Sequence, residues 1–152
     1  MLLVYITDYL KSGENVLVVG AYDPNDGRAA SGKNGSRGDY IFTSGIWQTV
    51  WLEPVEKQYI SQIKLVPDLK NNRLEVIAYT EDKELKVTAI ADNGTSEVAR
   101  TEGNSNMSFY LPIRESRLWS PDDPFLYGLK LQLKDRKGEI IDEVSSYFGM
   151  RS

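Results

Sequence analysis

The sequence predicts an all-β protein with two units, an immunoglobulin-like β-sandwich over residues 58–152 and an incomplete antiparallel β unit over residues 1–57. From residue 59 onward, short segments of alternating apolar and polar residues recur at regular spacing, as sandwich strands do. Turn-forming residues separate these segments, and the clearest is the hairpin signal at residues 92–94, Asp-Asn-Gly. No segment keeps the 3.6-residue period of an amphipathic helix.

The first unit offers few strand candidates for its length. Residues 16–19, Val-Leu-Val-Val, are continuously apolar, which indicates a strand buried on both faces. Thr7 or Asp8 can cap a single helical turn, which Gly13 ends. The expected strands are residues 2–6, 15–22 and 44–55, with residues 39–43 either a brief strand or an extended approach to the last of them. Because a sheet needs a partner layer, this unit looks incomplete by itself.

The segment Ser44–Val55 opens with a Ser-Gly turn signal and ends at Pro54, which stops a strand. Trp47 and Trp51 share one face of this expected strand. Two tryptophans are a large apolar load, so that face is expected to be buried.

The second unit reads as seven strands with one apolar face each. Residues 95–101 read as a short edge strand, and residues 114–118 as one helical turn. Residues 119–124 form a stiff loop that contains two prolines. The expected strands are residues 59–66, 73–80, 85–91, 95–101, 109–113, 127–134 and 139–148.

Composition excludes several classes of function. The net charge is −4, so nothing favours nucleic acid or an anionic membrane as a partner. The sequence contains no run of about 18 apolar residues, the length that a membrane-spanning helix needs. Residues 1–6 read as a strand and not as a signal peptide. The chain has no Cys and no His, which removes thiolate chemistry, the commonest general base and the commonest zinc ligand. Any chemistry would rest on carboxylates, Lys or Tyr.

Three stretches occur in a distinctive order. Residues 6–19 read ITDYLKSGENVLVV, residues 44–54 read SGIWQTVWLEP, and residues 118–127 read LWSPDDPFLY, followed by Asp142 and by YFGMR at residues 147–151. Together they resemble the family 2 glycoside hydrolases, which include β-galactosidases, β-glucuronidases and β-mannosidases. The resemblance covers nearly the whole chain.

The resemblance implies that residues 1–57 are the C-terminal part of the family's sugar-binding jelly-roll domain and that residues 58–152 are its immunoglobulin-like domain. The start of the jelly-roll would precede Met1. The catalytic (β/α)₈ barrel, with its paired glutamates, would follow Ser152.

The expected function is therefore that of an accessory, non-catalytic region of a family 2 enzyme of the β-galactosidase type, which hydrolyses O-glycosidic bonds in carbohydrate metabolism. The chain alone is expected to be inactive. The implied partner is carbohydrate. No cofactor or metal ion is implied, and a periplasmic or extracellular location is favoured.

Asp39 is the one substrate-binding residue that the resemblance implies. In the family, an Asp six residues before the Gly-Ile pair lies on a loop that reaches the active site and binds the sugar, through its hydroxyls or a bound cation. A carboxylate can accept two sugar O–H bonds. The alternative is an Asp that caps the strand after the Gly-rich loop of residues 23–38, which is longer than a structural connection needs.

Other residues have ordinary explanations beside functional ones. Turn chemistry explains Asp23 and Asp26, and Lys33 and Arg37 read as solvated loop cations. The tryptophans could stack on sugars, but core and interface packing is favoured. Trp119 suits a loop fastened to the sandwich end beside Tyr127, as in a tyrosine corner. Two carboxylate pairs could be proposed as catalytic, Glu53 with Asp39 and Glu139 with Asp142, but nothing in the sequence brings either pair together in a cleft. The three N-glycosylation sequons, at Asn34, Asn93 and Asn106, are short patterns that occur by chance.

Two other functions compete with the accessory region. One is a stand-alone carbohydrate- or protein-binding β-sandwich without enzyme activity, which an exposed Trp47 or Trp51 would favour. The other is an autonomous enzyme, which the missing His and Cys argue against. Because an incomplete jelly-roll leaves residues 16–19 uncovered, homo-oligomerisation or strand exchange, or a poorly ordered first unit, is also expected.

Overall fold

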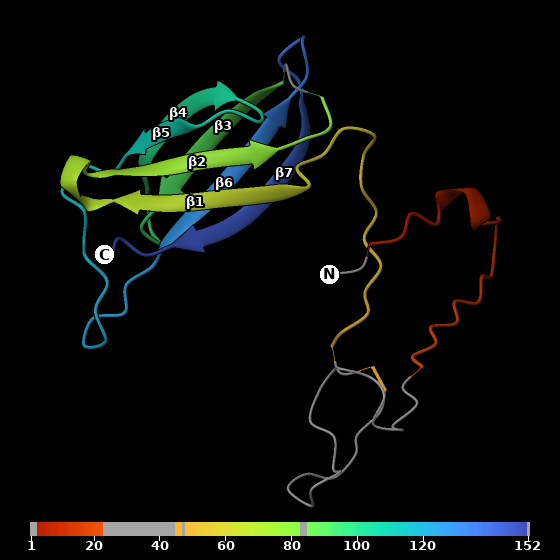
Figure 1. The fold of residues 1–152 in the computed structure, drawn as a ribbon. Helices are drawn as coiled ribbons and strands as arrows, with labels where there is room; N and C mark the ends of the chain where they lie inside the picture. Colours follow the sequence, from red (N-terminus) through yellow and green to blue (C-terminus); the bar gives the residue numbers. More distant parts are fainter. Residues whose placement is uncertain (1–2, 23–44, 47, 83–84, 152) are drawn as a thin grey trace, which may run out of the picture. The chain divides into compact units, whose positions relative to one another are not determined.

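The computed structural model describes residues 3–22, 45–46, 48–82 and 85–151, and the chain divides into two compact units, residues 1–52 and 53–152 (Figure 1). Among the described residues, the regular structure consists of seven strands and two short 3-10 helices, which confirms the predicted all-β class. All seven strands are in the second unit. A 3-10 helix, η1, spans Thr7–Tyr9, and another, η3, spans Leu69–Asn71. The strands are β1 (Gln62–Asp68), β2 (Arg73–Tyr79), β3 (Lys86–Asp92), β4 (Glu97–Asn104), β5 (Phe109–Pro112), β6 (Tyr127–Lys134) and β7 (Ile140–Phe148).

The seven strands form two antiparallel sheets. One sheet has the order β1-β2-β5 and the other has the order β4-β3-β6-β7. Three pairs of consecutive strands are hydrogen-bonded neighbours, β1 with β2, β3 with β4, and β6 with β7, while the remaining connections pass between the sheets. The result is a β-sandwich of the general plan that immunoglobulin-like domains also use (Figure 1).

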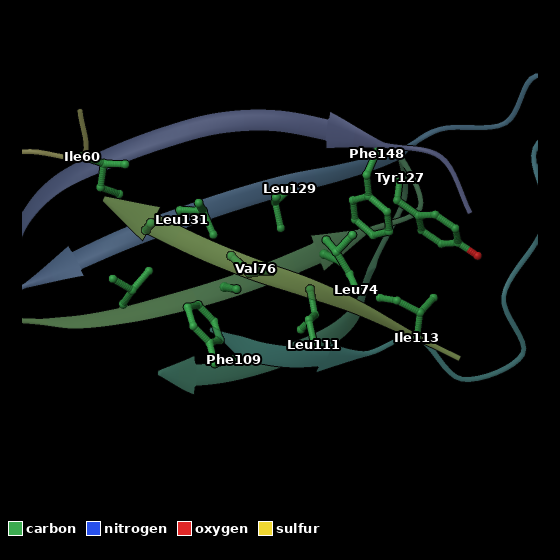
Figure 2. Close-up of a cluster of buried hydrophobic side chains, with 14 of the residues drawn as sticks. Ile60, Leu74, Val76, Phe109, Leu111, Ile113, Tyr127, Leu129, Leu131 and Phe148 are labelled. Carbon is green, nitrogen blue, oxygen red and sulfur yellow. The ribbon is translucent and has the colours of Figure 1, made fainter. Parts of the chain in front are cut away.

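The core lies between the sheets and follows the period-two pattern of the strands. In β2, Leu74 and Val76 are fully buried, and in β6 of the other sheet Leu131 and Leu133 are fully buried as well. Figure 2 shows several of these side chains pointing into the space between the sheets. Each buried side chain of this size contributes about 1.5–3 kcal/mol by leaving water.

One close contact fixes the distance between β4 and β5. The Phe109 ring lies against Gly103, where an added Cβ would stand 2.2 Å from the Phe109 Cγ. Only glycine fits at this position, because any side chain would displace the ring.

The sequence located the strands of the second unit well. Each predicted strand overlaps an observed one, and β4 lies at the edge of its sheet as expected. The helical turn predicted for residues 114–118 is wrong: a turn at Arg114 and Glu115 is followed at Leu118 by an isolated parallel bridge to Met150. A helical turn does not form because the backbone at Leu118 extends to pair with Met150.

The first unit differs from its prediction. In its described part, the residues predicted as strands 2–6, 15–22 and 44–55 are not paired into any sheet. Val16 and Val18 are 83% and 85% exposed, so the expected burial of residues 16–19 on both faces is wrong. A strand exists only where a neighbouring strand accepts its hydrogen bonds, and alternation or apolar content alone cannot supply that neighbour.

The single helical turn of the first unit is confirmed at η1, but its predicted cap is wrong. Ile6 precedes η1, and no side chain caps it. The next turn is closed by Asn15, which accepts a hydrogen bond from the Lys11 N–H at 3.0 Å and donates to the Lys11 carbonyl at 2.8 Å. The prediction that Gly13 ends the helical turn is wrong, because η1 ends at Tyr9 with an extended Leu10 after it, and Gly13, with φ +88°, lies in the next turn. No helix in the described part of the chain is long and apolar enough to cross a membrane.

Candidate functional site at the end of the sandwich

Asp39, the predicted substrate-binding residue, lies outside the residues that the structure describes, and its role stays a prediction. The same holds for Asp23, Asp26, Lys33, Arg37 and Trp47. The structure can therefore be tested for function at Trp51, at Trp119 and at the carboxylates of the second unit.

Trp51 is not buried. Its side chain is 63% exposed, and its neighbours Val50 and Leu52 are exposed as well. The prediction of a buried tryptophan face on a strand is therefore wrong at this residue. The apolar surface of residues 50–52 remains open to solvent or to another molecule.

Trp119 lies in the connection between β5 and β6, which we call the 114–126 loop. Tyr127, the first residue of β6, fastens this loop to the sandwich, because its hydroxyl oxygen accepts a hydrogen bond from the Arg117 N–H at 2.8 Å. The Tyr127 ring packs edge-on to Phe125 and stacks on Phe148, with centroid distances of 4.8 and 5.2 Å. Figure 2 shows Tyr127 and Phe148 together at one end of the core. The predicted fastening of the loop beside Tyr127 is confirmed.

Arg117 stabilises the loop from the solvent side. Its guanidinium group donates to both carboxylate oxygens of Asp123 and lies 4.4 Å above the Phe125 ring. The hydrogen bonds from Arg117 lower the pKa of Asp123, and those to Asp123 raise the pKa of Arg117. Both side chains are about half exposed, so solvent screens the pair and its stabilising effect is small. Ser120 and Asp123 also exchange two backbone hydrogen bonds, which closes the turn between them.

Trp119 binds the C-terminal residues of the unit. Its backbone N–H donates to the Met150 carbonyl at 3.0 Å, and the Arg151 guanidinium lies 4.7 Å from its ring centroid. One face of the indole is therefore engaged by a cation. Beside it is an open depression of about 220 Å³, which we call the Trp119 groove, lined by Leu69, Leu118, Trp119, Ser120, Pro121, Met150 and Arg151.

A second depression, of about 510 Å³, lies at the β6–β7 turn. Three of its charged groups have partners: the Lys134 ammonium is 3.1 Å from Glu102, and the Asp135 carboxylate accepts the backbone N–H groups of Lys137 and Glu139. Lys134 lowers the pKa of Glu102. The depression is lined by surface ion pairs and a turn.

Asp142 has a structural role. Its Oδ2 accepts the Ile60 N–H at 2.8 Å, which ties β7 to the start of the second unit. The Asp142 carboxylate therefore stabilises the fold, which weakens the alternative that it forms a catalytic pair with Glu139. Among the described residues, no group of three or more metal-binding side chains of the Asp, Glu, His and Cys types occurs.

Several other carboxylates of the second unit are held by hydrogen bonds that favour the ionised form. The pKa values of Asp68, Glu97 and Glu143 are lowered, mainly by Asn71, Arg100 and Gln132 respectively. A carboxyl group that protonates a glycosidic oxygen needs a raised pKa. Every shift named here is downward, as expected of surface ion pairs and turns.

Two of the three sequons lie in the described part of the chain, and their Asn side chains have different environments. The Asn106 side chain is committed, because its amide nitrogen donates to the carbonyls of Thr80 and Asp82 and its oxygen accepts the Thr80 N–H. The Asn93 side chain is exposed and accepts hydrogen bonds from Thr95 and Ser96 in a turn. Asn34 lies outside the described residues. Asn106 therefore holds the sandwich together.

Sequence reasoning singled out Trp119 but missed Arg117, Asp123 and Arg151. The signal for the Arg117–Asp123 pair was the opposite charges on the two sides of Pro121 in a short loop. No pattern placed Arg151 on Trp119, because the two residues are 32 positions apart and meet only in the folded sandwich.

Comparison with known proteins gives a consistent result. The family model described as "Glycosyl hydrolases family 2" matches residues 48–151. A Formosa agariphila protein that carries a β-glucuronidase name is 31% identical over 160 residues, covering 96% of this chain and 19% of that protein. A β-galactosidase of Clostridium acetobutylicum is 29% identical over 162 residues, covering 96% of this chain and 17% of that enzyme.

The solved structures agree on the fold. A β-glucuronidase from Ruminococcus gnavus superposes with a TM-score of 0.53 at 21% identity, over 63% of this chain and 16% of that one. The chain thus spans about a fifth of the length of the curated relatives that it matches.

Proposed function

The chain belongs to family 2 of the glycosyl hydrolases, and from this premise we propose that it is an accessory, non-catalytic region of an enzyme of the β-galactosidase type that hydrolyses O-glycosidic bonds. One observation carries the proposal: almost the whole chain aligns with enzymes named β-galactosidase or β-glucuronidase, yet it spans only 19% and 17% of the two relatives compared above. The rest of such an enzyme would supply the catalytic carboxylates.

The second unit supports this assignment through the roles of its polar groups. Asp142 and Asn106 hold segments of the sandwich together, and Asp123 closes the 114–126 loop. A sandwich whose carboxylates serve its own stability suits a scaffold that positions other parts of an enzyme.

We propose that the first unit contributes Asp39 to the sugar pocket of that enzyme. The carboxylate would accept hydrogen bonds from two sugar hydroxyls, which discriminates between sugars by hydroxyl stereochemistry. The support is the spacing of Asp39 from Gly45-Ile46 and the family to which the chain belongs.

The first test is hydrolysis of nitrophenyl β-galactoside, β-glucuronide and β-mannoside by this chain and by the product of the same reading frame extended in both directions. We expect the extended protein to cleave one of the three and this chain to cleave none. Hydrolysis by this chain alone, or an inert extended protein, would contradict the proposal.

The Asp39 role is tested in the extended protein with Asp39→Ala, and Asp26→Ala in the preceding turn is the matched control. Loss of two charge-assisted hydrogen bonds at the reacting sugar is expected to lower kcat/KM by at least about 10²-fold. Asp26→Ala should leave kcat/KM within about threefold of the parent value, since the Asp-Pro-Asn-Asp-Gly sequence around Asp26 predicts a turn role for this residue. Equal effects of the two variants would refute the assignment.

A second candidate function is a stand-alone binding β-sandwich, and the exposure of Trp51 favours it. In that case the chain should bind a glycan directly, and Trp51→Ala should remove the binding. Titration of this chain with galactan, glucuronan and mannan oligosaccharides by isothermal calorimetry distinguishes the two functions.

We also propose that residues 16–19 pair with the same segment of a second copy when the chain is alone. Four exposed apolar residues in an extended segment are a template for edge-to-edge pairing. Light scattering should give a dimer or larger species, and Val18→Lys should return it to a monomer. A parent chain that stays monomeric at about 100 μM, and so has a dissociation constant well above that concentration, would refute this pairing.

A further inference from the structure

The last described residues of the second unit, 149–151, follow the end of β7 and are held by the 114–126 loop. The Met150 carbonyl accepts the Trp119 N–H, and Leu118 and Met150 form an isolated parallel bridge. The Met150 side chain is fully buried. An added Cβ on Gly149 would be 3.3 Å from both Trp119 and Leu126, so the backbone passes close against the loop.

The loop that holds these residues is itself fastened by side chains. Arg117 and Asp123 bridge its two halves, and the Tyr127 hydroxyl anchors the Arg117 backbone to the end of β6. None of these bonds belongs to the hydrogen-bond ladders of the two sheets. The hydrogen bonds that hold residues 149–151 to the loop can therefore open while the sheet ladders stay intact, whereas the buried Met150 side chain belongs to the core of the sandwich.

The start and the end of the second unit lie at opposite ends of the sandwich. Asp142, near the beginning of β7, binds the Ile60 N–H just before β1, whereas Met150 follows the far end of β7 (Figure 1). Because a strand rises about 3.3 Å per residue, the nine residues of β7 separate these two points by about 25–30 Å. Each end has a contact of its own, Asp142 with Ile60 at the start and Trp119 with Met150 at the end.

We propose that the 114–126 loop is an exit clamp, a positioning device in which Trp119, braced by Arg117 and Asp123, fixes the direction of the chain at Met150 and Arg151. In the hydrolase, the clamp would set the orientation of the polypeptide that continues from this end of the sandwich. The orienting role in the hydrolase rests on the proposed function, whereas the contacts of the clamp belong to this chain alone.

The clamp is tested by NMR on the 152-residue chain. Two observables report it: the exchange rate of the Trp119 amide, which donates to Met150, and the ¹H–¹⁵N heteronuclear NOE of residues 149–151. Asp123→Asn weakens the brace and Arg151→Ala removes the cation from the indole. Glu97→Gln is the matched control, because the Glu97–Arg100 pair on β4 has similar exposure and lies on a different element.

We expect Asp123→Asn to raise the Trp119 exchange rate by about two- to fivefold and to lower the NOE at Met150 and Arg151, with β3 and β6 amides unchanged. Arg151→Ala should lower the NOE at residue 151 alone. Glu97→Gln should change neither observable. The clamp is refuted if Asp123→Asn leaves Trp119 exchange unchanged, or if Trp119 loses protection only together with β3 and β6.

The positioning role is tested in the extended protein by measuring kcat/KM for its cleaved sugar. Because catalysis depends on the placement of the reacting groups, Asp123→Asn should lower kcat/KM by about two- to fivefold without lowering Tm by more than Glu97→Gln does. Equal activity of the two variants refutes the positioning role. An extended protein without any glycosidase activity refutes the proposed function and leaves the NMR result standing.

Discussion

The two units of the chain have similar local signals and different outcomes. Residues 16–19 are as apolar as any strand of the sandwich, yet they are exposed, whereas Leu129, Leu131 and Leu133 of β6 are buried between neighbours on both sides. β6 has β3 on one side and β7 on the other, and a facing sheet covers its apolar side chains. The difference teaches that strand formation depends on the availability of a partner, which the local pattern does not contain.

Hydrogen exchange should show the largest contrast between the units. In the 152-residue chain, we expect amides of β3 and β6 to be protected at least about 10³-fold, because they open only with global unfolding. In samples diluted until the chain is monomeric, amides of residues 14–22 should exchange near the unprotected rate. Mass spectrometry after pepsin digestion measures both. Comparable protection in the two segments would show that residues 14–22 have a strand partner in solution.

A matched pair of leucine truncations sharpens the comparison. Leu131→Ala should lower the free energy of unfolding by about 2–5 kcal/mol, since it leaves a cavity in a fully buried site. Leu17→Ala, at a residue 61% exposed, should change it by less than about 0.5 kcal/mol. Urea denaturation followed by tryptophan fluorescence measures both. A Leu17→Ala effect as large as that of Leu131→Ala would break the comparison.

Two glycines give a smaller effect of the same kind. Gly103→Ala places a methyl group against the Phe109 ring and should destabilise the sandwich by about 1–3 kcal/mol. Gly20→Ala meets no atom within 4 Å and should have an effect near zero. Thermal denaturation by circular dichroism is sufficient. Tolerance of Gly103→Ala would mean that Phe109 can move without cost.

The smallest effect expected is the pH dependence of the Arg117–Asp123 pair. Because its pKa is lower in the folded state than in the unfolded chain, Asp123 stabilises the fold above the unfolded value, about pH 3.9, and loses this effect as the pH falls through the lower folded value. Asp123→Asn should therefore reduce the loss of Tm between pH 5 and pH 2. Asp122→Asn, one residue away, is the control. Identical pH profiles for the parent chain and Asp123→Asn would show that the pair adds no stability.

The sequence by itself determined the all-β class and the seven strands of the sandwich. Alternation such as that of Leu129, Leu131 and Leu133 specifies which face of a strand is buried, and turn residues such as Asn93-Gly94 specify where strands end, so local physics was sufficient. The predicted fastening of the loop at Tyr127 followed from the same kind of local signal, an aromatic residue at a strand start after a Pro-containing loop. The motifs also identified the family.

Only the tertiary structure decided which strand candidates find partners. It left residues 15–22 and 50–52 exposed, because pairing is a property of two segments and the pattern of one cannot reveal it. It also brought Asp142 to Ile60 and Arg151 to Trp119 across 82 and 32 positions of sequence. These contacts form the two ends of the sandwich, and they exist because the strand order places distant residues side by side.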